Sequence, residues 1–222
     1  MANNPKTPGS LTTKHWFGYM FGDWGGCMTF ALMSSIFSIY CTNVLGINTK
    51  VMFVLTVIWT VWDAINAPMM GALMDKAFAR KQDKRGKFRP WLLRATPLLA
   101  VSAIAMWTVP TFLDGIPLLV ALFSFKILYE ASYTMFNIPM GSLLSAMSTN
   151  DSERASLSSA RGVGAMFGNA IPGMIGPVII GLFGENTSTG YMITGVGCAV
   201  FGFVICLLHY ALTEERTSVG ED

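Results

Sequence analysis

Charged side chains are scarce in this sequence of 222 residues, at 13% of the total, against roughly 25% in a typical soluble domain. Hydrophobic residues make up 52% of the chain, and its mean hydropathy is +0.49. A soluble fold of this length could not cover so much apolar surface with so few polar groups. Lipid is therefore the expected solvent for most of the chain.

Motifs of catalysis and metal binding are also missing from the sequence. The four cysteines show no CxxC spacing, and the two histidines, His15 and His209, lie near opposite ends of the chain. The glycines from Gly162 to Gly168 have the spacing GxGxxxG, with no strand before them, so close helix packing explains them better than a dinucleotide fingerprint. There is no nucleophile elbow, phosphate loop or zinc motif. We therefore expect neither an enzyme nor a bound organic cofactor or resident metal.

Six long runs of the sequence contain few charges, at about residues 16–44, 51–74, 92–113, 116–147, 160–184 and 190–213. Each can supply the roughly 20 residues, at 1.5 Å rise per residue, with which a helix crosses a bilayer. The runs do not alternate between polar and apolar residues, as strands of a membrane barrel would. The sequence predicts an all-α membrane protein, with six transmembrane helices forming one bundle over residues 1–222.

Lysine and arginine are distributed unevenly between the two ends of these spans. The loop at 75–91 is strongly basic, and Lys6, Lys14, Arg154 and Arg216 fall on its side of the membrane, whereas Lys50 is alone on the other. The positive-inside rule then predicts a multi-pass protein of the cell membrane with both termini in the cytoplasm. A basic loop between two spans is a topology signal, so no nucleic-acid partner is expected.

Asp63 is an ionisable residue inside the second predicted span. It lies twelve residues after Val51, about 18 Å along a helix, which places it near the middle of the membrane. Asn66, one turn later, can present its amide oxygen beside the carboxylate. Such a costly group indicates either a Na⁺ or proton site, or a structural carboxylate bonded to a neighbouring helix.

A polar stripe follows one face of the fourth predicted span. Its members have spacings i, i+4, i+8, i+11 and i+15, and they are Lys126, Glu130, Thr134, Asn137 and Gly141, with Tyr133 at the edge of the stripe. A polar stripe on an otherwise apolar helix must face protein or water. Lys126 and Glu130 can neutralise each other at i,i+4, while Thr134 and Asn137 have the character of cavity-lining residues.

Two further spans carry polar residues of interest. In the first, Asp23 and Cys27 share one side, and nearby glycines would permit close helix approach or a local break. In the fifth, the guanidinium of Arg161 is suited to sugar hydroxyls or a carboxylate. The alternative for Arg161 is an interfacial side chain that extends to the cytoplasm.

Several longer sequence motifs indicate to which protein family the chain is similar. They are YMFGDWGG from Tyr19, WDAINAPMMG from Trp62, GKFRP from Gly86, NIPMGSLL from Asn137 and TEER from Thr213. In this order, over nearly the whole chain, the sequence resembles the glycoside–pentoside–hexuronide:cation symporters of the major facilitator superfamily.

The resemblance implies a fold and a set of site residues. It implies two six-helix bundles, each a 3+3 inverted repeat, with a sugar or glycoside bound between them; this chain corresponds to the N-terminal bundle. The implied substrate positions are Asp23, Cys27, Tyr133, Asn137 and Arg161. The implied cation-binding positions, for Na⁺ or H⁺, are Asp63, Asn66 and Thr134, and a second carboxylate of that site is replaced here by Ala67. The implied cytoplasmic gating residues are Asp75, Arg85, Lys87 and Arg89.

The resemblance also implies a transporter about twice as long as this chain. A second six-helix half could belong to the same longer chain, to a separate chain or to a second copy of this one, and these alternatives stay open. The expected function is cation-coupled sugar transport. The alternatives are an uncoupled sugar facilitator, because of Ala67, and a membrane scaffold or regulatory subunit that transports nothing.

Overall fold

A computed structural model describes residues 11–80 and 86–216, and within this part of the chain all regular structure is helical. The elements are α1 (Thr13–Ser35), α2 (Phe37–Ile39), a π-helical turn η1 (Tyr40–Val44), α3 (Thr49–Arg80), α4 (Arg89–Thr108), a 3-10 turn η2 (Val109–Phe112), α5 (Gly115–Met147), α6 (Asp151–Phe183) and α7 (Ser188–Leu212). Five helices are long and apolar enough to cross a membrane, and α1 with the segment that follows it makes a sixth, bent by 46°. The predicted all-α membrane fold is confirmed.

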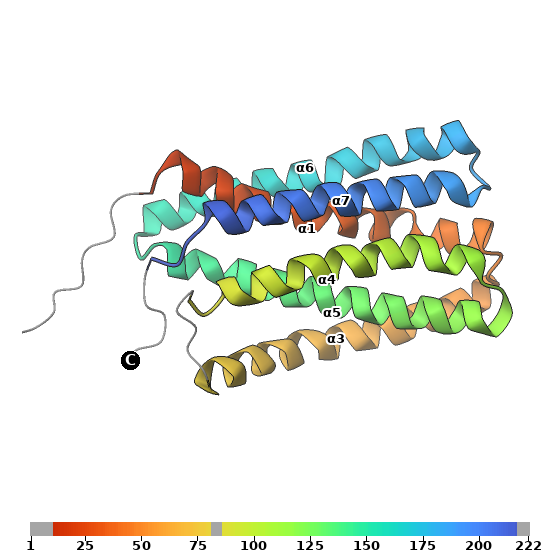
Figure 1. The fold of residues 1–222 in the computed structure, drawn as a ribbon, viewed down its shortest axis with the longest axis horizontal. Coiled ribbons are helices and arrows are strands. Elements are labelled where there is room, and N and C mark those ends of the chain that lie inside the picture. Colours follow the sequence, from red (N-terminus) through yellow and green to blue (C-terminus); the bar gives the residue numbers. More distant parts are fainter. Residues whose placement is uncertain (1–10, 81–85, 217–222) are drawn as a thin grey trace, which may run out of the picture.

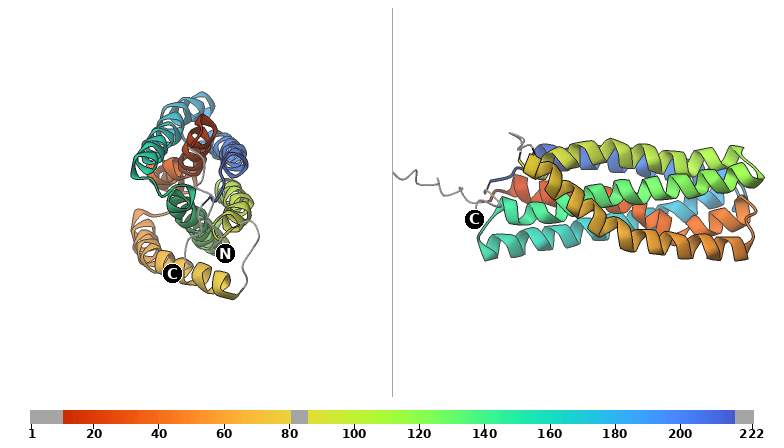
Figure 2. Two further views of the ribbon diagram at one scale, coloured as in Figure 1. Left: turned by 90° about the vertical axis from the view of Figure 1, so that its left-hand side faces the viewer. Right: turned by 90° about the horizontal axis from the view of Figure 1, so that it is seen from below.

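The long helices lie side by side and alternate in direction (Figure 1). Seen along the bundle, α3 lies at one edge and α6 at the other, with the remaining helices between them (Figure 2). α1 packs chiefly against α6 and α7, whereas α4 packs against α5 and α7. α3 packs chiefly against α5, so it is the least enclosed of the long helices.

The first span bends at Ile36, after two consecutive serines. The hydroxyl of Ser35 donates to the carbonyl of Ala31 at 2.5 Å, and that of Ser34 donates to the same carbonyl at 3.1 Å. Such bonds back to the preceding turn weaken the helical ladder and bend helices. The glycines of this span serve close packing instead: a Cβ added to Gly25 would lie 2.6 Å from the Cys206 sulfur.

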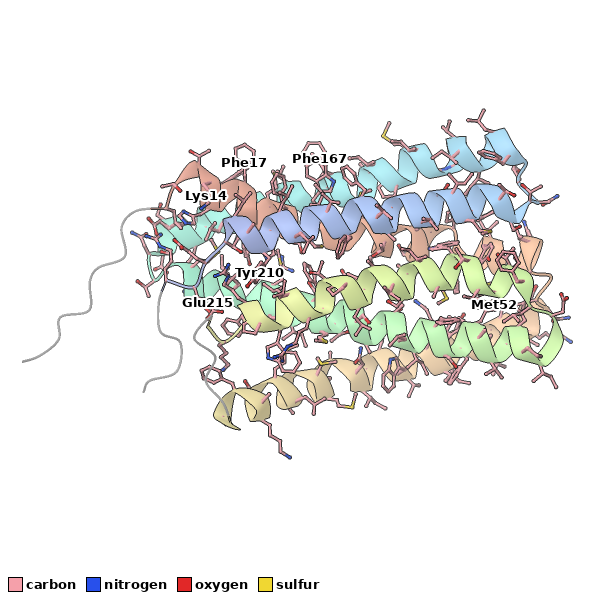
Figure 3. All side chains as sticks on the ribbon, viewed as in Figure 1. Lys14, Phe17, Met52, Phe167, Tyr210 and Glu215 are labelled. Atoms are coloured by element: carbon pink, nitrogen blue, oxygen red, sulfur yellow. The ribbon has the colours of Figure 1, made fainter. Side chains whose placement is uncertain are left out.

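Large aromatic side chains fill the interior between α1, α4, α5 and α7. Tyr19, Tyr40, Trp107 and Phe136 are at most 2% exposed. The buried hydroxyls have partners, since that of Tyr19 donates to the carbonyl of Met140 at 3.1 Å and that of Tyr40 lies 2.8 Å from the Thr111 hydroxyl. By contrast, Figure 3 shows Phe17 and Phe167 pointing outward from the bundle, where lipid can cover them.

We call the end of the bundle at which α1 begins and α7 ends the terminal end. The chain after α7 folds back there, and the Glu215 carboxylate accepts hydrogen bonds from the backbone N–H groups of Lys87, Phe88 and Arg89 at 2.7–2.9 Å. Figure 3 shows Glu215 beside Tyr210 at this end, far from Met52. The first N–H groups of a helix have no partner within the helix and favour a negative charge, so Glu215 caps α4 from a distant part of the sequence.

Replacing Glu215 with alanine is expected to lower the free energy of unfolding by about 1–3 kcal/mol, since three buried or half-buried N–H groups lose a charged acceptor. Thermal unfolding of the detergent-solubilised protein measures the effect. Glu185→Ala is the matched control, because Glu185 is exposed in the turn before α7. Equal melting temperatures for the two variants would contradict the capping role.

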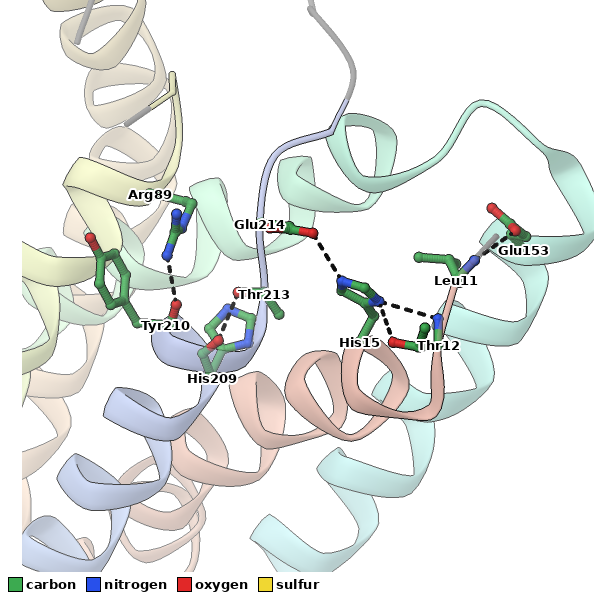
Figure 4. A network of polar contacts seen from close by, with 9 residues as sticks. All are labelled: Leu11, Thr12, His15, Arg89, Glu153, His209, Tyr210, Thr213 and Glu214. Atoms are coloured by element: carbon green, nitrogen blue, oxygen red, sulfur yellow. Dashed lines mark hydrogen bonds and ion pairs between the residues drawn. The ribbon is translucent and has the colours of Figure 1, made fainter. Parts of the chain in front are cut away.

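A second polar network closes the terminal end around the start of α1 (Figure 4). His15 Nε2 lies 3.2 Å from the Glu214 carboxylate, and the Leu11 N–H donates to Glu153 at 3.0 Å. The backbone N–H of Arg216 donates to the carbonyl of Ala146 at 2.8 Å. The contacts of Glu214 and Arg216 fix the segment after α7 against α1 and α5, and the contact of Leu11 fixes the chain before α1 against α6.

Candidate functional site

Arg161 connects three helices inside the bundle. Its Nε donates to Asp23 Oδ2 at 2.6 Å, and its Nη2 lies 3.5 Å from Asn137 Oδ1. Asp23 is on α1, Asn137 on α5 and Arg161 on α6, and each lies ten residues from the terminal end of its helix. At 1.5 Å per residue, all three are about 15 Å deep, so three predicted substrate residues meet at one level of the bundle.

Cys27 and Tyr133 complete the predicted substrate set. The Cys27 thiol lies near Tyr133 and near Asn169 on α6, and the Tyr133 ring stacks on Phe30 with centroids 5.1 Å apart. The structure thus brings together all five residues that the resemblance implied for the substrate.

Two polar residues of this cluster escaped the sequence analysis. Asn169 contacts Cys27, and the Tyr19 hydroxyl interacts with Arg161. The available signal for Asn169 was an amide about two turns after Arg161 in an uncharged stretch of the same span. Tyr19 gave no such signal, because a tyrosine near the start of a membrane span is ordinary in the interfacial region.

A second polar cluster lies between α3 and α5. The Asn66 amide donates to Thr134 Oγ1 at 2.8 Å and to the carbonyl of Glu130 at 3.1 Å. Asp63 is exposed, and its carboxyl group reaches that of Glu130. Of the three predicted cation-binding residues, Asn66 and Thr134 are therefore in direct contact, and Asp63 is connected to them through Glu130.

The donor atoms of this second cluster suit a hard cation. Asn66 is fully buried, and its Oδ1 has no hydrogen-bond partner among the described residues. The Asp63 carboxylate and Thr134 Oγ1 are the other oxygen atoms that the predicted residues offer, and oxygen ligands are those that Na⁺ prefers.

Lys126 and Glu130 form the predicted ion pair one turn apart on α5. Their side chains are 12% and 7% exposed, respectively, so the pair is largely withdrawn from the surroundings. On its other side, the Lys126 ammonium lies over the rings of Phe37 and Tyr129, at 5.8 Å and 5.5 Å from their centroids. The expected mutual neutralisation is confirmed.

Three of the predicted gating residues, Asp75, Lys87 and Arg89, lie at the terminal end, where α3 continues to Arg80 and α4 begins at Arg89. Lys87 Nζ is 3.3 Å from Asp75 Oδ1. Arg89 is engaged elsewhere: its Nη2 donates to the carbonyl of Tyr210 at 3.0 Å, and its guanidinium lies 4.6 Å from the centre of the Tyr210 ring (Figure 4). Arg85 lies outside the described residues.

A bundle of membrane-spanning helices with polar clusters at depth is typical of a membrane transport protein. Residues 18–222 match the family described as MFS/sugar transport protein, and the chain belongs to this family. The resemblance stated from the sequence strings is thereby confirmed.

Several curated relatives are similar over most of this chain. The uncharacterized symporter YjmB of Bacillus subtilis is 32% identical over 97% of this chain and 46% of its own length. The isoprimeverose transporter of Lactiplantibacillus pentosus is 29% identical over 90% of this chain and 41% of its own length. The glucuronide carrier protein homolog of Escherichia coli is 29% identical over 90% of this chain and 43% of its own length. The chain thus spans less than half the length of these relatives, which are transporters and not enzymes.

Proposed function

We propose that this chain forms half of an alternating-access carrier for a sugar or glycoside. The observation that carries the proposal is the meeting of Asp23, Asn137 and Arg161 at one depth of the bundle. Charged groups at such depth are costly unless they face protein or a water-filled path. A guanidinium fork, a carboxylate and an amide supply the donors and acceptors that sugar hydroxyls need.

Space beside Arg161 supports a substrate role for this residue. The Arg161 side chain is 37% exposed, so its bonds to Asp23 and Asn137 leave part of the guanidinium accessible. A Cβ added to Gly141 would lie 3.3 Å from Arg161 Nη1, which means that the glycine keeps one side of the fork open. The names of two relatives, an isoprimeverose transporter and a glucuronide carrier protein homolog, favour a sugar or glycoside as the substrate class.

A second six-helix half is part of the proposal. α3 and α6 form the edges of the bundle (Figure 2) and expose many large apolar side chains, from Val51 to Leu73 and from Met166 to Phe183. The second half would come from the same longer chain, a separate chain or a second copy. The lysines and arginines near the terminal end, against Lys50 at the other end, support cytoplasmic termini in the cell membrane.

Two forms of the carrier differ in their use of a coupling ion. Asp63, Asn66 and Thr134 support a cation-coupled form with Na⁺ or H⁺. The alanine at position 67 and the Lys126–Glu130 pair beside the site favour an uncoupled facilitator as the second candidate.

Uptake of a panel of labelled glycosides tests the proposal. The assay uses host cells that have no glycoside carriers of their own and that express this gene together with the sequences that flank it in its genome. We expect saturable uptake of at least one glycoside, competed by the unlabelled compound. Imposing or removing a Na⁺ or H⁺ gradient then separates the two forms. Correct membrane insertion without uptake of any glycoside would favour the scaffold or regulatory subunit instead.

A further inference from the structure

Three charged side chains lie together near the middle of the bundle, two acidic and one basic. Glu130 pairs with Lys126 and also reaches Asp63. Lys126 is eleven residues from the start of α5 and Asp63 is fourteen residues from the start of α3, so both are about 17–21 Å from the end opposite the terminal end. Buried charges are kept in proteins where they are paired. Here the Lys126 ammonium pairs with Glu130, whose carboxyl group also lies near that of Asp63.

The Lys126 ammonium is held in place from more than one side. Glu130 binds it through an ion pair, and the rings of Phe37 and Tyr129 lie within 6 Å of it on the other side. Cation–π contacts of this kind attract an ammonium most strongly where water is excluded. The side chain is only 12% exposed, so Lys126 is a built-in part of the cluster.

The cluster without its lysine would have the composition of a sodium site. The carboxylates of Asp63 and Glu130 would face each other with no counter-charge. Asn66 Oδ1, which is buried and has no partner among the described residues, and Thr134 Oγ1 would supply neutral oxygens. A monovalent cation there would neutralise one of the two carboxylate charges, as the Lys126 ammonium does, and would meet the preference of Na⁺ for oxygen ligands.

We infer that the Lys126 ammonium takes the place of a sodium ion in this cluster, so that the carrier operates without Na⁺ at this site. Lys126 is then the residue that determines ion specificity, and Glu130 is its anchor. The link to sugar uptake rests on the proposed function, but sodium binding can be measured with no sugar present.

Thermal unfolding of the purified full chain at 1–100 mM NaCl, with choline chloride keeping the ionic strength constant, tests this inference. The wild-type melting temperature is expected to stay the same across the series. Lys126→Met is expected to gain a sodium-dependent rise of about 5–10 °C, which corresponds to a site filled at roughly 100-fold excess over its Kd. Adding Glu130→Gln to Lys126→Met removes one carboxylate and is expected to abolish the rise.

The matched control is Lys50→Met, because Lys50 is exposed at the start of α3; it should respond to sodium as the wild type does. Lys126→Gln keeps a similar length and a hydrogen bond to Glu130, and it replaces Lys126→Met if that variant does not fold. A wild-type melting temperature that rises with sodium and loses this response in Asp63→Asn would overturn the inference. So would a folded Lys126 variant that gains no sodium response. Absence of glycoside uptake would count against the proposed function alone.

Discussion

Arg161→Ala is expected to reduce glycoside uptake at least about 100-fold per inserted molecule, which corresponds to about 2.7 kcal/mol. Asp23 has a side chain that is 12% exposed, and the bond to Arg161 Nε at 2.6 Å is the ion pair that neutralises it. Without the guanidinium, a buried carboxylate stays unpaired, and truncating one partner of a buried pair typically costs about 3–5 kcal/mol. Asn137 and the bound sugar would lose a donor at the same time.

Arg154→Ala is the matched control for this variant. Arg154 also lies on α6, but it is 44% exposed and 4.0 Å from a fully exposed Asp151, so uptake should change less than about twofold. The double variant Asp23→Asn with Arg161→Gln separates structure from binding. It removes both charges and is expected to restore the amount of folded protein without restoring uptake. Full uptake in the double variant would assign Arg161 a structural role only.

Local pairs were predictable from the sequence, and distant pairs were not. The Lys126–Glu130 ion pair follows from a spacing of four residues on one helix. The Arg161–Asp23 bond joins residues 138 apart, and the spacing of polar residues in one sequence does not say which helices are neighbours. For this reason the sequence could not say whether the Arg161 side chain extends to the cytoplasm or bonds to α1 inside the bundle, and the structure shows the second.

The cap that Glu215 provides for α4 shows the same limit at the terminal end. Its partners lie 126–128 residues away, and nothing in the string TEER says that the chain folds back after α7. The bend at Ile36 was missed for a different reason. The glycines in the first span were compatible with either a break in the helix or close packing against another helix. In the structure Gly25 packs closely against Cys206 on α7, and the bend occurs elsewhere.

The two polar clusters share α5, which explains why its stripe was the most informative pattern in the sequence. Asn137 faces Arg161, while Thr134 and Glu130 face Asn66 on α3. Tyr133, also on α5, interacts electrostatically with Glu130 and with Asp23 and Arg161. A rocking movement of α5 would therefore be felt at both clusters. Such a shared helix is one way in which a change at one cluster can affect the other.

Gly164→Ala is expected to destabilise the protein by about 3 kcal/mol through overpacking, although alanine is the better helix former. A Cβ at this position would overlap the backbone carbonyl oxygen of Met20 on α1, and a backbone atom cannot move aside as a flexible side chain can. Gly168 makes the same close approach one turn later, where a Cβ would lie 2.7 Å from the carbonyl oxygen of Trp24. Small residues four apart permit such contact between membrane helices, and overpacking there forces the helices apart.

Gly173→Ala on the same helix is the matched control, because no atom lies within 4 Å of a Cβ added there. Helix propensity alone should then leave it as stable as the wild type or more stable, by up to about 1 kcal/mol. Melting temperature and the monodisperse fraction after detergent extraction measure both variants. Since α1 carries Asp23 and α6 carries Arg161, helices forced apart at Gly164 should also weaken that ion pair, so uptake per folded molecule should fall in Gly164→Ala and not in Gly173→Ala. Equal stability of the two variants would mean that α1 and α6 do not approach as closely as the contact between Gly164 and Met20 requires.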